Sequence, residues 1–244
     1  MKGELYVVGI GPGDEGYMTR DAGAALDKAE LIVGYSLYVN LLCEQYKSKS
    51  IYSTGMGGEA DRCRYALQQA ASGINTAVIC SGDAGVYGMA SLILDLSKEY
   101  EEVDINIIPG ITAALSGAAK LGAPIGNDFA VISLSTVLTP WERIEKRLKC
   151  AAEGDFAIVL YNPMSHHRPD TLKAACDIIS GHTGCDRAAG YVRNIGRDEE
   201  STEVTTLGKL ADMKLDMFTT VFIGSSDTGI CNGKMITGRK YGIE

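Results

Sequence analysis

The feature that most constrains this chain is an apolar, strand-like run that begins at Leu5 and ends in three glycines at alternate positions, Gly9, Gly11 and Gly13. A strand, a glycine loop and then a helix bring the backbone close to a small ligand, because glycine has no Cβ. Asp14 follows the glycines directly and places a carboxylate at the end of the loop. The beginning of the chain therefore predicts a ligand-binding loop after the first strand.

The spacing of the glycines argues against the two best-known nucleotide-binding loops. A dinucleotide site needs G-x-G-x-x-G opening directly into a helix whose free N–H groups meet the pyrophosphate, and Pro12 removes one of those donors. The next strand-like run ends in Gly34 instead of the acidic residue that binds a ribose. The pattern G-x-x-x-x-G-K-[ST] is absent from the sequence. We therefore expect this loop to hold something other than a phosphate.

Composition and charge exclude several classes of protein. The net charge of −8 and the lack of a basic stripe argue against a nucleic-acid partner. No apolar run reaches the ~18 residues that span a membrane. Seven scattered cysteines without a C-x-x-C pair, and a first segment without signal-peptide character, predict reduced thiols and a cytoplasmic location. With only three histidines, no metal site is expected.

Strand-like and helix-like segments alternate through the first half of the chain. This alternation predicts an α/β domain with a mainly parallel sheet, whose loops gather at the carboxyl ends of the strands. Residues 51–58 are expected to form a glycine-rich connection. The expected strands are 5–8, 31–33, 76–80 and 103–108, and the expected helices are 19–28, 37–46, 59–72, 89–100 and 114–120.

Glycine and proline interrupt the pattern at 121–126 without a following β–α unit. We therefore expect an N-terminal domain over 1–120, a linker over 121–127 and a C-terminal α/β domain over 128–244. Its short later connections favour antiparallel pairing, and hence a mixed sheet. Here the expected strands are 129–134, 156–161, 188–192, 203–206 and, as the last, 219–223, and the expected helices are 141–152 and 171–179.

Three loops follow strands of the first half, at 9–14, 81–88 and 109–113. In an open parallel sheet such loops line one crevice, where their small residues let a flat ligand approach the backbone. Asp83 can bond backbone amides of its own loop or receive an ammonium group, and Thr112 can offer a hydroxyl. The alternative is that these are ordinary α/β turns that need positive φ.

The second half has two polar segments that can serve a site. Tyr161-Asn-Pro-Met-Ser-His-His-Arg-Pro169 follows a strand, and its adjacent His166 and His167 cannot easily share one metal. These histidines can act as a general base or anchor a substrate, or belong to a plain surface loop. Arg193 and Arg197 lie beside a glycine and suit bidentate recognition of carboxylates. The alternative for them is an exposed turn with solvated charges.

Taken together, the loops resemble a known family. Val8-Gly-Ile-Gly-Pro-Gly-Asp14, Gly34-Tyr35, Gly82-Asp83 with Tyr87-Gly88, and Pro109-Gly-Ile-Thr-Ala113 resemble the successive signatures of the tetrapyrrole methylases. These enzymes use S-adenosylmethionine in siroheme and cobalamin synthesis. The resemblance covers essentially the whole chain. One departure is Ala84, where many members of the family have proline after Gly-Asp.

Within the family, Tyr161-Asn-Pro-x-Ser-x-x-Arg168 and Val192-Arg-Asn-x-Gly-Arg197 are most similar to the C17-methyltransferases of corrin synthesis. Those act on precorrin-3B in the aerobic pathway or on cobalt-factor III in the anaerobic one, and couple methylation to ring contraction. The resemblance implies a homodimer of two stacked α/β domains, with the methyl donor in the crevice between them and no protein-bound metal.

The resemblance also implies roles for single residues. The contacts to S-adenosylmethionine carried over by motif are Pro12, Gly82, Asp83, Ala84, Val86, Thr112, Ala113, Asn162 and Ile195. Because the macrocycle carries acetate and propionate groups, an acidic protein must concentrate positive charge locally. The expected substrate contacts are Arg168, Arg193, Arg197 and Asp14, and His166 or His167 is the candidate acid or base.

Three alternatives stay open at this point. The chain can be another methylase of the same family, acting at C11 or C20 or on uroporphyrinogen. It can be a non-catalytic protein that binds a tetrapyrrole or a nucleotide. It can also be an NAD-dependent oxidoreductase, which a comparison of the two cofactors by calorimetry would distinguish.

Overall fold

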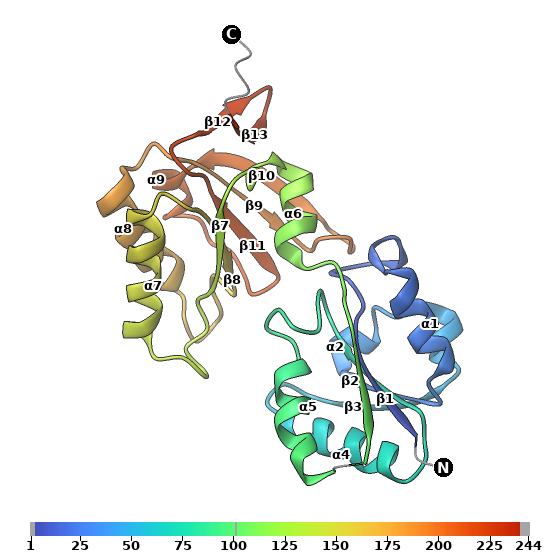
Figure 1. Cartoon of the computed structure of the whole chain (residues 1–244). Helices are drawn as coiled ribbons and strands as arrows, with labels where there is room; N and C mark the ends of the chain where they lie inside the picture. The colour runs from blue at the N-terminus through green and yellow to red at the C-terminus, as the bar shows by residue number, and fades with distance from the viewer. Residues whose placement is uncertain (1–2, 101, 240–244) are drawn as a thin grey trace. The chain divides into compact units, whose positions relative to one another are not determined.

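The computed structural model describes residues 3–100 and 102–239. Met1 and Lys2, part of the segment in which we expected no signal peptide, lie outside these residues. The chain divides into two compact units, Met1–Ala113 and Ala114–Glu244, and each contains a sheet with packed helices (Figure 1). Among the helices described, none combines the length and apolar character needed to cross a membrane.

The first unit is built on a five-stranded, fully parallel sheet with the order β3-β2-β4-β1-β5. The predicted mainly parallel sheet is therefore confirmed. Its strands are β1 (Glu4–Gly9), β2 (Leu31–Tyr35), β3 (Ser50–Thr54), β4 (Thr76–Cys80) and β5 (Asp104–Ile108). The helices are α1 (Arg20–Lys28), α2 (Ser36–Val39), α3 (Glu44–Lys47), α4 (Glu59–Ala71) and α5 (Ala90–Leu96), with 3-10 turns η1 (Glu15–Tyr17) and η2 (Ser97–Glu99).

Helices cover both faces of this sheet. Successive side chains of a strand point to opposite faces, so each strand contributes to the packing on both sides. In β1, Leu5 and Val7 pack with residues of α4 and α5. Tyr6 and Val8 pack with residues of α1 and α3 on the other face. A strand buried on both faces reads as a continuous apolar run, which explains why β1 and β4 were predicted at their correct places.

Two segments of the first unit differ from expectation. Residues 50–54 form the edge strand β3, where we expected only a glycine-rich connection. This strand is largely exposed and rich in serine and threonine, so it lacks the apolar pattern of a buried strand. The helix expected over 37–46 is instead two short helices, α2 and α3, separated by residues 40–43.

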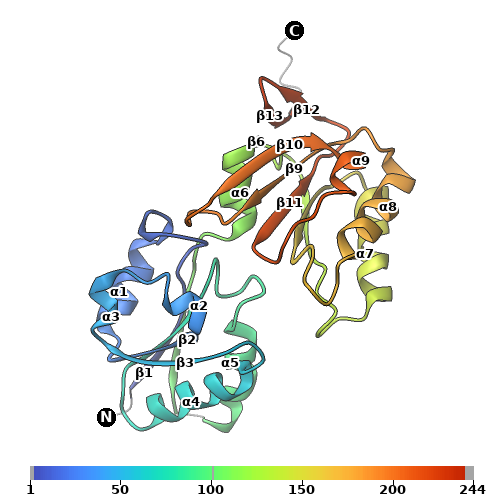
Figure 2. The same ribbon diagram turned by 180° about the vertical axis from the view of Figure 1, so that it is seen from behind.

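The second unit is built on a five-stranded mixed sheet with the order β10-β9-β11-β8-β7 (Figure 2). The β7–β8 pair is parallel and the other pairs are antiparallel, which confirms the expected mixed sheet. Its strands are β7 (Phe129–Ser133), β8 (Ala157–Tyr161), β9 (Ala188–Arg193), β10 (Ser201–Thr206) and β11 (Thr219–Ile223). The helices are α6 (Ala113–Leu121), α7 (Trp141–Glu153), α8 (Thr171–Thr183) and α9 (Leu207–Leu210).

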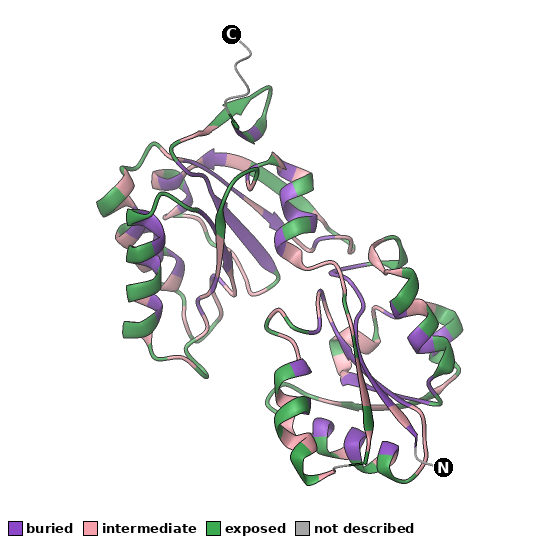
Figure 3. Cartoon of the chain, viewed as in Figure 1, coloured by how far each residue is buried: buried purple, intermediate pink, exposed green. Residues whose placement is uncertain are grey.

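The main core of this unit lies between the sheet and the helices α7, α8 and α9, which contribute residues such as Leu148, Ile179 and Leu207. Figure 3 shows the buried residues on the strands and on the helix sides that face them. On the opposite face, α6 approaches the sheet closely at Gly117, where a Cβ would lie 2.8 Å from the Phe222 ring. The small residues of α6 thus allow it to pack against the sheet.

The division between the units lies seven residues before the end of the domain expected over 1–120. Helix α6 belongs to the second unit, and part of the expected linker 121–127 forms β6 (Gly122–Ala123). This strand pairs with β13 (Lys234–Thr237), which also pairs with β12 (Thr228–Cys231). The expectation that 219–223 is the last strand was therefore wrong. The Asn232-Gly233 turn, with φ of 49° and 72°, is a hairpin signal that we did not use.

Candidate functional site

The three predicted loops of the first unit meet at the carboxyl edge of its sheet. Gly11 and Gly82 exchange two backbone hydrogen bonds, with Gly11 N to Gly82 O at 3.0 Å and Gly82 N to Gly11 O at 2.7 Å. Both glycines have positive φ, 79° and 72°, a region in which other residues are strained. These two hydrogen bonds join the loops after β1 and β4. Gly11 and Gly82 suit these positions because the backbone there has positive φ.

The third loop, after β5, approaches the other two at Gly110. A Cβ at this position would overlap Gly82 O and would lie 2.6 Å from Gly9 C. A Cβ on Gly82 would in turn lie 3.6 Å from Thr112 Cα. Glycine is therefore needed at Gly110 so that three chain segments can approach one another.

Asp83 fastens this arrangement through both of its carboxylate oxygens. Oδ1 accepts hydrogen bonds from the N–H groups of Gly85 at 2.8 Å and Val86 at 3.0 Å. Oδ2 accepts one from the N–H of Gly110 at 2.9 Å. Of the two roles open for Asp83, bonding to backbone amides is the one observed. The carboxylate positions the loop instead of presenting a bare charge.

The remaining expected donor contacts of the first unit surround this crossing. Pro12 and Ala84 are buried, while Val86, Thr112 and Ala113 are half-buried. Ala84 O accepts a hydrogen bond from Ala90 N at 3.0 Å, at the start of α5. Asp14 is exposed and caps η1, where its Oδ1 accepts from Gly16 N at 2.9 Å. This local role does not prevent Asp14 from also meeting a substrate.

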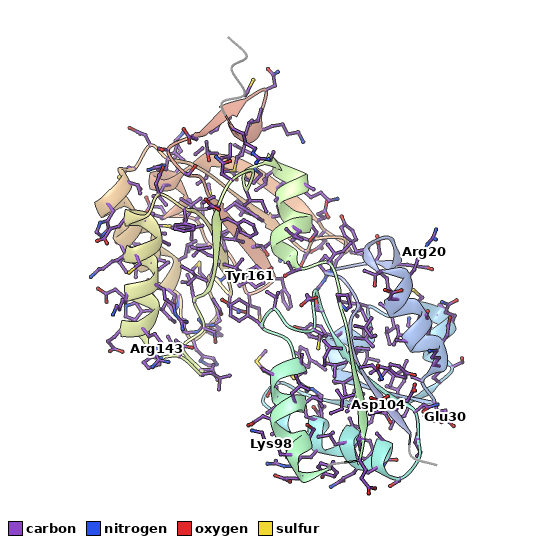
Figure 4. The ribbon with its side chains drawn as sticks, viewed as in Figure 1. Arg20, Glu30, Lys98, Asp104, Arg143 and Tyr161 are labelled. Atoms are coloured by element: carbon purple, nitrogen blue, oxygen red, sulfur yellow. The ribbon has the colours of Figure 1, made fainter. Side chains whose placement is uncertain are left out.

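In the second unit, β7, β8 and β9 end at one edge of the sheet. Ser133 is the register partner of Tyr161, and the row formed by Leu160, Val221 and Tyr191 lies one residue behind it. The loops 134–140, 162–170 and 194–200 therefore leave the sheet on the same side. Figure 4 labels Tyr161, whose hydroxyl accepts a hydrogen bond from the N–H of Ala114 at 2.7 Å.

Asn162 lies directly after β8 in the left-handed region, with φ of 53°. Its Nδ2 donates to Ser133 Oγ at 3.0 Å. Asparagine tolerates this backbone conformation better than most residues, so the residue suits the abrupt turn that the chain makes here.

Arg168 is half-buried, and its Nη1 donates to the carbonyl oxygen of Leu134 at 2.6 Å. The backbone of Arg168 also pairs with Ser165 in an isolated bridge. His166 and His167 are both exposed, and their rings stack at 5.7 Å between centroids. The arginine therefore fastens two loops, while the histidines are open to solvent.

The other two arginines lie at the end of β9 and in the loop after it. Arg193 forms an ion pair with Asp216, with Nε to Oδ2 at 2.7 Å. The guanidinium of Arg197 lies 5.9 Å from the centre of the Phe218 ring. Ile195 between them is buried, with 4% of its surface exposed.

Some residues that shape the site were absent from the sequence-based prediction. Ser133 and Asp216 hold Asn162 and Arg193, and Gly9 and Gly110 permit the crossing of the loops. The two glycines lay inside the motifs and could have been assigned a packing role. Ser133 and Asp216 are distant in sequence from their partners, and no local signal marks them.

Gly11, Pro12 and Gly82 at the glycine crossing are buried, and Pro12 offers no N–H there. Within residues 3–100 and 102–239, no three His, Cys, Asp or Glu side chains are gathered as ligands for a metal ion. Comparison with known proteins bears directly on which family uses this arrangement.

A family model described as "Tetrapyrrole (Corrin/Porphyrin) Methylases" matches residues 4–211. The chain belongs to this family. The resemblance inferred from the glycine loops is therefore confirmed, and the tetrapyrrole methylase fold accounts for both α/β units.

Two relatives cover almost the whole chain. A "Probable cobalt-factor III C(17)-methyltransferase" of Salmonella typhimurium is 44% identical over 238 residues, covering 97% of this chain and 99% of its own. A "Precorrin-3B C(17)-methyltransferase" of a Sinorhizobium species is 38% identical over 234 residues, covering 94% and 92%. The similarity to C17-methyltransferases expected from the loops after β8 and β9 is thus found over full-length proteins.

Solved structures of tetrapyrrole methylases share the fold. The methyltransferase CobJ has a TM-score of 0.89 at 37% identity, over 97% of this chain and 100% of that one. A uroporphyrin-III C-methyltransferase from Thermus thermophilus, complexed with S-adenosyl homocysteine, has a TM-score of 0.71 at 19% identity, over 91% and 97%. The latter likeness establishes the fold alone.

Proposed function

We propose that this chain is an S-adenosylmethionine-dependent methyltransferase that methylates C17 of precorrin-3B or cobalt-factor III, with ring contraction, in cobalamin synthesis. Membership of the tetrapyrrole methylases and the 44% and 38% identities to proteins named for these reactions support it. The observation that carries the proposal is the crossing of three backbone loops at Gly11, Gly82 and Gly110.

S-adenosylmethionine, when bound, supplies a methyl group activated by a sulfonium. The protein has to place the attacking carbon in line with the S–CH₃ bond at about 3–3.5 Å and exclude water. The first-unit loops suit the donor, with Pro12, Gly82, Asp83, Ala84, Val86, Thr112 and Ala113 as proposed contacts. Asn162 and Ile195 are the proposed contacts from the second unit.

The edge of the second unit suits an anionic macrocycle. Arg168 and Arg197 lie in the loops that follow β8 and β9, and Arg193 is the last residue of β9. Each can offer N–H donors to acetate or propionate groups. Asp14 is proposed as a further substrate contact. His166 and His167, both exposed, are proposed to transfer protons during ring contraction.

The test is turnover of labelled S-adenosylmethionine by the purified chain with precorrin-3B and with cobalt-factor III. We expect one substrate to gain a methyl group at C17 and to show the absorbance change of ring contraction. Methylation at another carbon would indicate a different member of the family. Binding of the donor and the tetrapyrrole without transfer would indicate a non-catalytic binding protein.

A matched pair of variants tests the substrate arginines. Arg168→Ala is expected to weaken tetrapyrrole binding at least tenfold, through loss of charge and of the contact to Leu134 O. Arg147→Ala removes an exposed arginine from α7 and should leave binding unchanged. Equal affinities of the two variants would exclude an anchoring role for Arg168.

The family resemblance also leads us to propose a homodimer, which sedimentation equilibrium of the purified chain can test. A molecular mass of one chain across the accessible concentration range would exclude it. The cytoplasmic location expected from the cysteines is a separate prediction, which fractionation of the producing cell would test.

A further inference from the structure

The loop between β7 and α7, residues 135–140, carries two adjacent apolar side chains that are almost fully exposed. Val137 is 81% exposed and Leu138 is 94% exposed. They are the most exposed large hydrophobic side chains in the described part of the chain. A single exposed leucine is common. Two adjacent apolar side chains with this exposure are less common and can form a surface for binding.

The base of this loop is firmly held. Leu134 is fully buried, its N–H donates to Tyr161 O at 2.9 Å, and its carbonyl accepts from Arg168 Nη1 at 2.6 Å. The N–H of Ser135 donates to Ser133 Oγ at 3.3 Å. At the other end, Pro140 O accepts from Arg143 N at 3.1 Å as α7 begins. The two apolar side chains therefore project from a fixed base.

Charged side chains occur at both ends of the loop. Arg168 binds the carbonyl of Leu134 at its start, and Glu142 and Arg143 lie in the first turn of α7 directly after it (Figure 4 labels Arg143). Strands β7, β8 and β9 end in register at one edge of the sheet. The loop after β7 leaves the sheet at this edge. Arg168, in the loop after β8, and Arg193, the last residue of β9, belong to the same edge. Apolar and positively charged groups are thus combined at one edge.

We infer that Val137 and Leu138 form the platform against which one face of the tetrapyrrole macrocycle lies. This inference rests on the proposed function. A tetrapyrrole has broad apolar faces and anionic groups around its rim, so its chemistry matches two exposed apolar side chains at the sheet edge that also carries Arg168 and Arg193. Ligand sites in general combine apolar walls with a few placed polar groups. The platform is thus a further proposed substrate contact, from the loop after β7, beside the contacts proposed for Arg168, Arg193 and Arg197.

The experiment compares the wild-type chain with Leu138→Ser and with the double variant Val137→Ser/Leu138→Ser. We expect the Kd and the KM for cobalt-factor III or precorrin-3B to rise about 10- to 100-fold, because a buried apolar contact is lost. The affinity for S-adenosylmethionine should stay within about twofold. Since both side chains are exposed in the free protein, the unfolding midpoint in urea should be nearly unchanged.

Leu94→Ser is the matched control. Leu94 lies on α5 of the first unit and is 49% exposed, so this change removes an exposed leucine elsewhere. It should leave the tetrapyrrole Kd unchanged. An equal effect of Leu94→Ser and Leu138→Ser would contradict a specific platform.

Sedimentation equilibrium of the same variants tests whether a second copy of the chain, instead of the tetrapyrrole, covers Val137 and Leu138. If Leu138→Ser lowers the molecular mass and leaves the tetrapyrrole Kd unchanged, the loop is an interface between copies and the inference is wrong. The Kd is measured by direct titration, so it tests the platform without turnover. A wild-type chain that binds the tetrapyrrole but transfers no methyl group would overturn the proposed function and not the platform.

Discussion

Asp83 Oδ2 accepts a hydrogen bond from the N–H of Gly110 at 2.9 Å, and this bond joins the loop after β4 to the loop after β5. The two residues are 27 positions apart in the sequence. Because the other carboxylate oxygen binds Gly85 and Val86, one side chain sets both the shape of its own loop and its distance from the next. We propose that the donor surface depends on this bond.

Replacement of Asp83 by alanine leaves three backbone N–H groups without their acceptor. We expect the free energy of unfolding to fall by about 1–3 kcal/mol, and the affinity for S-adenosylmethionine to fall at least tenfold. Asp83→Asn keeps one acceptor oxygen and should give an intermediate loss of both. Urea unfolding and calorimetric titration measure the two effects. Wild-type donor affinity in Asp83→Ala would show that the loop does not need this carboxylate.

Gly110→Ala tests the close approach of the three loops. The new Cβ would overlap Gly82 O and lie 2.6 Å from Gly9 C, so backbone has to move. We expect a loss of about 1–3 kcal/mol in stability, typical of overpacking, and no measurable donor binding. Gly181→Ala is the control, because a Cβ there meets nothing within 4 Å. Donor binding by Gly110→Ala at wild-type affinity would contradict the crossing that we describe.

Glu200 provides a pH-dependent contribution to stability. Burial alone raises the pKa of its carboxyl. Two contacts outweigh burial and lower the pKa below 4.5. The N–H of Gly196 lies 2.6 Å from Oε2, and the ammonium of Lys120 lies 2.7 Å from Oε1. A folded-state pKa below the unfolded value means that the contribution is complete above about pH 4.5. It is lost as the pH falls through the folded-state pKa.

The stability difference between the wild type and Glu200→Gln should therefore shrink on acidification. We expect a difference of about 1 kcal/mol near neutral pH, modest because the side chain is 24% exposed. Urea unfolding at a series of pH values measures it. A constant difference across the acidic range would rule out the linkage.

The cysteines should react with a thiol reagent in distinct groups. Burial raises the pKa of Cys63 and Cys176 to about 12 and that of Cys80 to about 11, so these thiols are protonated and shielded. Cys150, Cys185 and Cys231 are exposed.

In the native protein we expect the three exposed thiols to react first. Cys43, half-buried and with its pKa raised chiefly by burial, should follow more slowly. The three buried thiols should react only after urea is added. Mass spectrometry of the labelled peptides identifies each group, and early labelling of Cys80 would contradict the packing around β4.

Elements with strong local signals were predicted well. The helix expected over 19–28 is α1, and Thr19 caps it through its Oγ1, which accepts from Ala22 N at 3.1 Å. The three glycine loops were expected to meet because parallel strands present their carboxyl ends at one edge, and they do. In each case the controlling interaction is local or follows from the topology of the sheet.

Other features could not be inferred from local pattern. Arg168 Nη1 binds the carbonyl of Leu134, 34 positions away, a contact that the sequence did not indicate. Arg193 likewise pairs with Asp216, 23 positions away. The exposed strand β3 lacks an apolar pattern. Long-range partners and exposed edges leave no periodic trace in a single sequence, so the structure is needed to find them.

The position of β4 between β2 and β1 has a consequence for synthesis of the protein on the ribosome. The glycine loop near residue 11 is made among the first residues, but its partner at Gly82 emerges only much later. Since β1 and β2 do not pair with each other, an incomplete chain has a gap in its sheet until β4 inserts. The donor contacts proposed for the first unit are therefore complete only after the loop that ends with Ala113 has been made, and those at Asn162 and Ile195 follow later still.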